Sequence, residues 1–301
     1  MPDRTATAAP DTLGALVQEI AERLAPRLGE GTDAALEARE LLAALHDMPR
    51  HWPSLAREMS VAPDARARAL AAADRRARGA PLQYAAGQAA FRHLTLDVDE
   101  RVLIPRPETE QLVDVVLELT RATAVDGVAV DVGTGSGAIA LSLASEGSFA
   151  QVIGTDVSLD ALAVAHANAR RCAAALRARV ELRHGSVLGP VPERGLCAVV
   201  SNPPYIAFDE AASLPAGVRD WEPPVALFSG AGGMAVLSAL VRAAAPALAP
   251  GGLLALEVDA RRASLVAELA ASHGMYEAVR VLLDLTGRER FVVARRREEQ
   301  G

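Results

Sequence analysis

Residues 196–206 read LCAVVSNPPYI, and the interpretation of the fold starts from this stretch. The apolar run Leu196–Val200 has the composition of a buried β-strand. A proline donates no ladder hydrogen bond and fixes its own φ near about −65°, so the strand must end before Pro203 and Pro204. The two prolines then form a rigid, exposed corner. Open α/β sheets bind their ligands at the carboxyl ends of their strands, which makes this corner a candidate binding site.

The corner suits the recognition of a planar NH2 group. The side-chain oxygen of Asn202 and the carbonyl of Pro203 can each accept one N–H, and the ring of Tyr205 offers a stacking surface. An amide or aromatic amine is a poor nucleophile, and two acceptors on its hydrogens favour the charge that develops as it attacks. The tetrapeptide is typical of methyltransferases acting on NH2 groups of adenine, cytosine or glutamine. A proline-rich turn is the simpler alternative for the two prolines alone.

Length and composition restrict the class of protein. A chain of 301 residues can hold one large α/β domain and a smaller one. The formal charge of −7 argues against a protein that binds mainly by neutralising phosphates. No apolar run has the length of a membrane span, and residues 1–11 lack the apolar core of a signal peptide. Because Cys172, Cys197 and the histidines show no metal-ligand spacing, we expect a soluble cytoplasmic protein without a metal.

Residues 1–85 are predicted to form a small helical domain. Residues 1–10 are small and polar and are expected to be disordered. Apolar residues then recur with a helical period after Thr12, and two more helices are expected over Asp33–His46 and Asp64–Arg78. Such a bundle could dock a macromolecular substrate, and structural support alone would explain it equally well.

Residues 86–106 are predicted to be a β-hairpin that links two domains. One strand would cover Leu94–Val98, and Val102–Ile104 would return after a turn. The segment Pro105–Pro107 precedes a helix and is interpreted either as a wall beside a pocket or as a plain linker.

From residue 128, strands alternate with helices as in βαβ units. The expected strands are Val128–Val132, Gln151–Thr155, Val180–Leu182, Leu196–Val200, Leu253–Val258, Tyr276–Leu283 and Arg290–Ala294. The expected helices begin at Ala138 or cover Leu159–Ala175, Met234–Leu248 and Ala263–Ser272. This pattern predicts an α/β sheet of parallel strands.

The loop after the first of these strands reads GTGSG over residues 133–137. A dinucleotide fingerprint has the spacing G-x-G-x-x-G and carries a pyrophosphate, so this loop departs from it. Asp156, at the end of the next strand, is placed to hold two ribose hydroxyls. Loop and acid together resemble the S-adenosylmethionine site of class I methyltransferases, where glycines let the backbone approach the cofactor.

The chain resembles one family in particular, the release-factor glutamine methyltransferases known as PrmC or HemK. The matching segments are Pro81–Tyr84 with Gly87 and Phe91, Leu103–Glu110, Asp131–Ile139, Asn202–Ile206, Glu222-Pro223 with Ala226-Leu227, and Asp284–Arg288. They span about residues 70–295. The first two are the specific ones, since DNA adenine methyltransferases share the tetrapeptide alone.

The resemblance implies a class I S-adenosylmethionine-dependent methyltransferase domain, a Rossmann-like seven-stranded and mostly parallel sheet, over residues 107–301. It implies methylation of the side-chain amide nitrogen (N5) of the glutamine in the Gly-Gly-Gln loop of peptide chain release factors, with S-adenosylhomocysteine as product. Release factors would be the partners, without direct contact to nucleic acid or membrane, and a monomer is expected.

Residue roles are carried over by position. The cofactor would contact Gly133, Thr134, Gly135, Ser136, Gly137, Asp156, Val187 and Asn202. The substrate glutamine would be held by Asn202, Pro203, Pro204 and Tyr205, of which Asn202, Pro203 and Tyr205 would be catalytic. The chain departs from the family at Ser186, where an acid is frequent, at Asp259, where glycine is frequent, and at Arg261 or Arg262, where glutamine is usual.

Other functions are also compatible with parts of this pattern. A glutamine methyltransferase acting on a ribosomal protein would share the corner and differ in its N-terminal domain. An adenine-N6 methyltransferase on DNA or RNA would need a basic recognition region and base flipping. A non-catalytic S-adenosylmethionine-binding protein would have no use for an intact corner.

Overall fold

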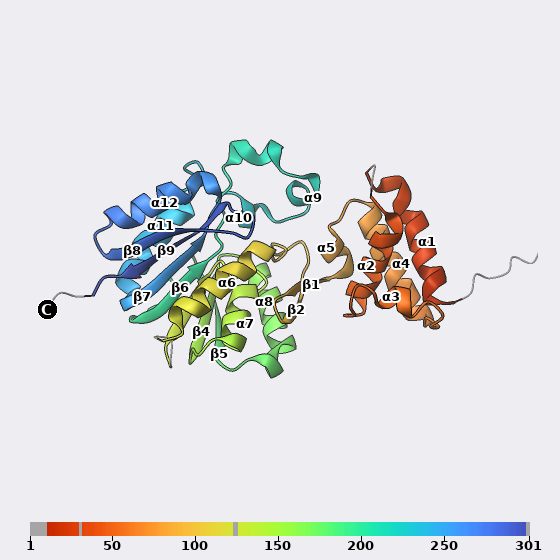
Figure 1. Ribbon diagram of the computed structural model, residues 1–301, viewed down its shortest axis with the longest axis horizontal. Helices are drawn as coiled ribbons and strands as arrows, with labels where there is room; N and C mark the ends of the chain where they lie inside the picture. Colours follow the sequence, from red (N-terminus) through yellow and green to blue (C-terminus); the bar gives the residue numbers. More distant parts are fainter. Residues whose placement is uncertain (1–10, 30–31, 123–125, 299–301) are drawn as a thin grey trace, which may run out of the picture. The chain divides into compact units, whose positions relative to one another are not determined.

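The computed structural model describes residues 11–29, 32–122 and 126–298, so the expected disorder of residues 1–10 lies outside the described residues. The chain forms two compact units (Figure 1). One consists of Met1–Gln88 together with Ala216–Trp221, and the other of Ala89–Pro215 together with Glu222–Gly301. Within the described residues, no helix combines the length and the apolar character that a membrane crossing requires.

The first unit is a bundle of helices. Its elements are α1 (Leu13–Leu24), α2 (Ala34–Leu45), α3 (Trp52–Leu55), α4 (Pro63–Ala77) and α5 (Leu82–Ala86). The side chains of Thr12 and Asp33 accept backbone N–H groups at the starts of α1 and α2, which satisfies donors that a helix leaves open. The three predicted helices are present. The short helices α3 and α5 were not predicted, because helices of four and five residues show no periodicity.

The hairpin in residues 86–106 pairs different strands from the predicted ones. Strand β1 (Gln88–Phe91) pairs with β2 (Leu94–Asp97), and Arg92 makes the turn with a φ of 54°. The prediction that Val102–Ile104 returns as a strand was wrong. These residues form irregular chain after a turn in which Val102 N donates to Asp99 O, with Val102 and Ile104 buried and Leu103 half-buried. Their apolar side chains contribute to a cavity wall and the core instead of a ladder.

The second unit contains a seven-stranded sheet with the order β5-β4-β3-β6-β7-β9-β8. Its strands are β3 (Val128–Val132), β4 (Gln151–Asp156), β5 (Arg179–His184), β6 (Leu196–Ser201), β7 (Leu248–Glu257), β8 (Tyr276–Leu283) and β9 (Glu289–Arg296). The pairs from β5 to β7 are parallel, whereas β9 runs antiparallel to β7 and β8. The predicted Rossmann-like, mostly parallel sheet is therefore confirmed.

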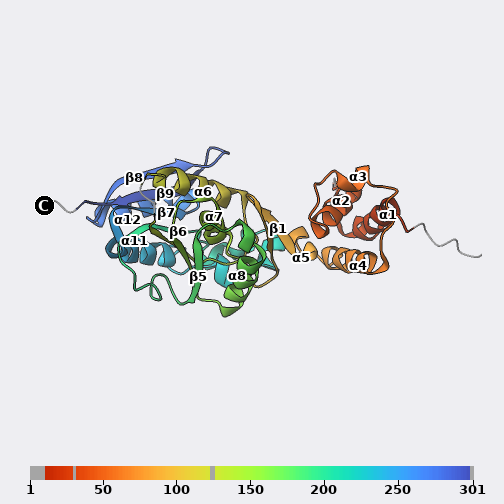
Figure 2. The ribbon, with the colours of Figure 1, turned by 90° about the horizontal axis from the view of Figure 1, so that it is seen from below.

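Helices cover both faces of this sheet (Figures 1 and 2). Helices α6 (Pro107–Thr120) and α7 (Ala138–Glu146) pack into one apolar cluster, and α11 (Ala235–Ala247) and α12 (Ala260–Ser272) pack into the other. Helix α8 (Leu159–Arg171) contacts β4 and β5 and ends earlier than predicted, with a 3-10 turn after it.

The strand register brings the candidate site together. Val132 of β3 lies beside Thr155 of β4, and Asp131 lies beside Val200 of β6. The residues that come after these strands therefore meet at one edge of the sheet. The chain also changes direction here: β4 and β5 extend the sheet on one side of β3, and β6 adds on the other. Ligands of open α/β sheets bind at such a switch point.

We predict that Leu254→Ala, in the middle of β7, lowers the free energy of unfolding by about 2–5 kcal/mol, because it leaves a cavity in the core. Leu254 is 1% exposed, and Leu285, which is 89% exposed, provides a matched control. Leu285→Ala is expected to change the free energy of unfolding by less than about 0.5 kcal/mol. Urea denaturation followed by circular dichroism measures both, and equal losses in the two variants would contradict this description of the core.

Candidate active site

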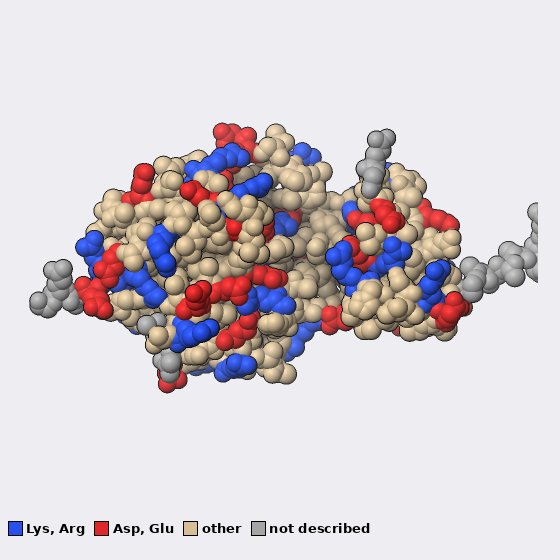
Figure 3. Space-filling model, viewed as in Figure 1, with Lys and Arg blue, Asp and Glu red and all other residues tan. Residues whose placement is uncertain are grey.

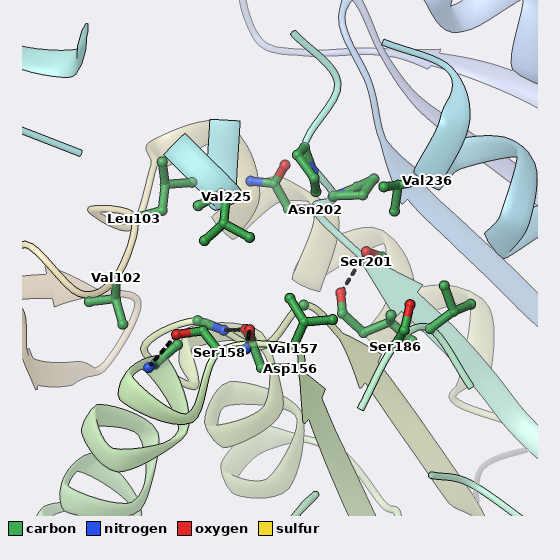
Figure 4. Close-up of a pocket in the computed structure, with 18 of the residues that line it drawn as sticks. Val102, Leu103, Asp156, Val157, Ser158, Ser186, Ser201, Asn202, Val225 and Val236 are labelled. Atoms are coloured by element: carbon green, nitrogen blue, oxygen red, sulfur yellow. Dashed lines mark hydrogen bonds between the residues drawn. The ribbon is translucent and has the colours of Figure 1, made fainter. Parts of the chain in front are cut away.

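A cavity of about 250 Å³ lies at the carboxyl edge of β3, β4 and β6 (Figure 4). Seven of the predicted site residues line it: Gly133, Gly135, Asp156, Val187, Asn202, Pro203 and Pro204. Figure 4 places Asn202 across the cavity from Asp156. Most other lining side chains are apolar, among them Val102, Leu103, Val225 and Val236. A carboxylate at one end and an amide at the other thus face a largely apolar interior.

Four other predicted site residues are not among those that line the cavity: Thr134, Ser136, Gly137 and Tyr205. Thr134 Oγ1 donates to Asp131 Oδ2 over 2.7 Å, and the Ser136 carbonyl accepts from Asn168 Nδ2 over 2.9 Å. Gly137 is the N-cap residue just before α7 and has a φ of 86°. Tyr205 is half-buried and packs against the apolar cluster that includes α11 and α12. Their contacts to a ligand remain predictions.

The glycine loop needs glycine at its cavity positions. Gly133 and Gly135 have φ values of 73° and 55°, in the left-handed region that other residues avoid. A Cβ at either position would meet no protein atom within 4 Å, so the space beside the loop is open to a ligand. The loop is braced by Asp131, whose Oδ2 accepts from Thr134 and from Ala140 N. Burial raises the pKa of the Asp131 carboxyl to about 7.

The residues around Asp156 fit the expected cofactor. Asp156 Oδ2 accepts from Gly135 N and Oδ1 accepts from Ser158 N, each over 2.9 Å. A carboxylate has about four acceptor sites, so each oxygen can still accept from a ribose hydroxyl. The apolar walls suit the adenine and the methionine chain. The fit supports S-adenosylmethionine as the ligand.

Val187 occupies an unusual backbone conformation beside the cavity. Its φ is 52°, which is rare for a β-branched residue. Its carbonyl accepts from Thr155 Oγ1 over 3.1 Å, and this bond fixes the conformation. Ser186, where the related family often has an acid, also lines the cavity. The part of the cavity wall after β5 therefore offers the hydroxyl of Ser186 and the apolar side chain of Val187.

Hydrogen bonds orient the corner after β6. Ser201 Oγ donates to Val132 O over 2.6 Å and ties the end of β6 to β3. Asn202 Nδ2 donates to Thr109 Oγ1 over 3.0 Å, and Thr109 Oγ1 donates to Glu257 Oε2 over 2.8 Å. Sequence reasoning assigned no role to Thr109 or to Glu257. Thr109 lies 93 residues from Asn202 and 148 residues from Glu257, so no spacing pattern connects them.

Two groups at the corner have shifted pKa values. Burial raises the pKa of Glu257 to about 7, although the hydrogen bond from Thr109 and the nearby Arg290 oppose the shift. Burial also raises the pKa of the Tyr205 phenol to about 12, so this ring is neutral at physiological pH. The corner therefore holds a carboxyl whose ionisation changes near neutrality.

An ion pair joins two walls of the cavity. Arg106 donates to Glu222, which is buried by the protein. Arg106 lies just beyond the wall residue Leu103, and Glu222 lies just before the wall residue Val225. The pair thus connects the segments next to both walls, although Pro105, Arg106 and Pro107 are not themselves among the residues that line the cavity.

Two residues just after β7, Asp259 and Arg262, differ from the related family, and their side chains contact each other. Arg262 Nη1 donates to Asp259 Oδ2 over 2.8 Å, and Nε donates to Gly232 O over 2.8 Å. Arg262 Nη2 also donates to Glu210, five residues beyond the corner, over 3.1 Å. The extra acid and the extra base are therefore paired. They support the segment that comes after Tyr205.

Metal ligands are not gathered anywhere in residues 11–29, 32–122 and 126–298. Within these ranges, no group of three or more His, Cys, Asp and Glu side chains is arranged to hold a metal ion.

Two family models and several curated relatives match this chain. The family model for the methyltransferase small domain matches residues 109–214, and the model for the PrmC N-terminal domain matches residues 15–87. A release factor glutamine methyltransferase from Moorella thermoacetica is 43% identical over 288 residues, which are 96% of this chain and 100% of that protein. One from Cereibacter sphaeroides is 40% identical over 272 residues, which are 90% of this chain and 95% of that protein.

Solved structures agree with the fold. A methyltransferase from Pyrococcus furiosus aligns with a TM-score of 0.51 at 18% identity, over 69% of this chain and 92% of that chain. At this identity the likeness supports the fold alone.

We predict that Asp156→Ala weakens the binding of S-adenosylmethionine about tenfold to a hundredfold, since a hydrogen bond to a charged group contributes about 1.5–3 kcal/mol. Asp160→Ala is the matched control, because Asp160 is exposed in the first turn of α8 and does not line the cavity. Isothermal titration calorimetry gives both dissociation constants. An unchanged constant for Asp156→Ala would show that this carboxylate does not hold the ribose.

Proposed function

Because this chain belongs to the release factor glutamine methyltransferase family, we propose that it methylates the side-chain amide nitrogen (N5) of the glutamine in the Gly-Gly-Gln loop of peptide chain release factors. The methyl donor is S-adenosylmethionine, and the product is S-adenosylhomocysteine. The observation that supports the proposal most strongly is the orientation of Asn202, whose amide nitrogen is already engaged by Thr109. Its amide oxygen is the group left to accept a hydrogen bond from a substrate NH2.

When bound, S-adenosylmethionine supplies an electrophilic methyl group. Asn202 Oδ1 and the Pro203 carbonyl each accept one N–H of the substrate amide and fix its nitrogen in the cavity. That nitrogen becomes positively charged as it attacks, and the two oxygens stabilise the charge. The proton leaves after the new N–C bond has formed, so no general base is required beforehand. Orientation of the reacting groups accounts for a large part of the rate.

The remaining roles are assigned from the same family. Tyr205 and Pro204 shape the corner around the substrate glutamine. The helical domain, residues 1–85, docks the release factor, and the hairpin 86–106 links it to the catalytic domain 107–301. The match of the PrmC N-terminal domain to residues 15–87 supports this assignment. The protein would act as a monomer in the cytoplasm, without a metal and without contact to a membrane.

Charge favours a protein substrate over a nucleic acid. The formal net charge is −7, and acidic and basic side chains are interspersed on the face drawn in Figure 3. An adenine methyltransferase gains affinity from a continuous basic surface along the phosphates. A glutamine methyltransferase acting on a ribosomal protein remains the alternative, because it would share the same corner.

Mass spectrometry of substrates tests the proposal. The purified protein and S-adenosylmethionine are incubated with a release factor, ribosomal proteins and a DNA duplex in parallel. We expect one added methyl group on the Gly-Gly-Gln glutamine of the release factor and none on DNA. Methylation of a ribosomal protein alone, or of adenine alone, would contradict the proposed substrate.

We predict that Asn202→Ala reduces methyl transfer by at least about a hundredfold while the protein stays folded, because the substrate nitrogen loses an acceptor that acts as charge develops. Initial rates with the release factor give the loss, and thermal unfolding verifies the fold. Turnover at the wild-type rate would remove the corner from the mechanism.

A further inference from the structure

We propose that Thr109 and Glu257 are positioning residues that hold the Asn202 amide with its oxygen toward the cavity, and that methyl transfer therefore requires ionised Glu257. This inference rests on the function proposed above. Its basis is the chain of two hydrogen bonds, Asn202 Nδ2 to Thr109 Oγ1 at 3.0 Å and Thr109 Oγ1 to Glu257 Oε2 at 2.8 Å. Figure 4 shows Asn202 at the cavity that the substrate must enter.

The direction of these bonds is set by the chemistry of their ends. An ionised carboxylate only accepts hydrogen bonds, so the Thr109 hydroxyl must donate its single proton to Glu257. The Thr109 oxygen can then only accept from Asn202. The amide branch that faces Thr109 must therefore be the NH2 group, and the other branch is the oxygen. In this way a carboxylate behind the site determines which end of Asn202 the substrate meets.

Protonation of Glu257 removes this constraint. A protonated Glu257 can donate to the Thr109 oxygen, and the Thr109 hydroxyl is then free to donate toward Asn202. The group that accepts from it is the amide oxygen, so Asn202 is rotated and presents its NH2 to the cavity. The NH2 group of Asn202 would then face the NH2 group of the substrate, and two hydrogen-bond donors cannot bind each other. Methyl transfer is therefore expected to rise with pH as Glu257 ionises.

The charges around Glu257 come from several elements. Arg290 of β9 and Arg106, just before α6, favour the ionised form, and Glu108 in the first turn of α6 disfavours it. Tyr205 at the corner is neutral near pH 7. Arg290 is itself paired with Asp284 at 3.3 Å, which limits what it contributes to Glu257. Glu257 is 2% exposed, and its burial is the main cause that raises its pKa to about 7.

Two substitutions at Thr109 separate orientation from packing. Thr109→Val removes the hydroxyl at nearly constant volume, and we expect kcat/KM on the release factor to fall roughly tenfold to a hundredfold. Thr109→Ser keeps the hydroxyl and should restore activity to within about threefold of the wild type. Thr120→Val is the matched control in the same helix. Thr120 is 1% exposed and donates to Val116 O over 2.7 Å, away from the site, so its kcat/KM should not change.

The pH profile distinguishes this role from a merely structural one. In the wild type, kcat/KM should rise with pH to a plateau, with a midpoint near 7. Glu257→Gln still offers an oxygen to the Thr109 hydroxyl but does not ionise. Its NH2 group can also donate to the Thr109 oxygen, as protonated Glu257 does, so this variant should lose the step in the profile and stay below the wild-type plateau. An unchanged step in Glu257→Gln, or wild-type kcat/KM in Thr109→Val, would overturn the proposal.

Nuclear magnetic resonance gives a second readout that needs neither cofactor nor substrate. The side-chain NH2 signal of Asn202, assigned by its loss in Asn202→Asp, should shift with pH around a midpoint near 7 in the free protein. The shift should vanish in Glu257→Gln, and the signal should move in Thr109→Val but not in Thr120→Val. A signal that does not titrate in the wild type would overturn the proposal, even if the release factor is methylated. If the release factor is not methylated, the proposed function fails, and this titration still decides the proposal.

Discussion

The parallel pairing of β6 between β3 and β7 is the constraint on which the site depends. It brings the end of β6 to the edge where β3 and β4 also end, and the prolines stop the strand there. The hydrogen bond from Ser201 Oγ to Val132 O fixes the two strand ends to each other. The glycine loop and the corner consequently face one cavity, although about seventy residues separate them along the chain. A slip of β6 by one residue would turn Asn202 to the other face of the sheet.

Residues behind the corner fix the orientation of its side chains. Helix α6 supplies Thr109 behind Asn202, and the end of β7 supplies Glu257 behind Thr109. The buried Arg262 links the start of α12 to Gly232 and to Glu210, close after Tyr205. These contacts satisfy polar groups inside the protein, where an unpaired group is costly. Hydrogen bonds with the protein therefore fix the corner, and the cavity in front of it remains accessible to ligands.

The sequence predicted the sheet, its helices and seven residues that line the cavity. These features depend on local patterns, namely the alternation of strand and helix, glycines in the left-handed region and prolines that end a strand. The sequence did not predict that Val102 and Leu103 line a wall of the cavity, nor that Ala216–Trp221 belongs to the helical unit. Thr109 and Glu257 escaped for the same reason. Their contacts join segments that are distant in the chain and arise from tertiary packing, so the spacing of residues along the sequence does not reveal them.

A crystal structure of the protein with S-adenosylhomocysteine and a release factor is the decisive experiment, because it shows which atoms hold the substrate amide. We predict that the glutamine nitrogen lies about 2.7–3.2 Å from both Asn202 Oδ1 and the Pro203 carbonyl oxygen. The Asn202 nitrogen is expected to remain on Thr109. A glutamine amide bound elsewhere, or an Asn202 whose oxygen faces Thr109 in a complex grown above about pH 8, would contradict the mechanism.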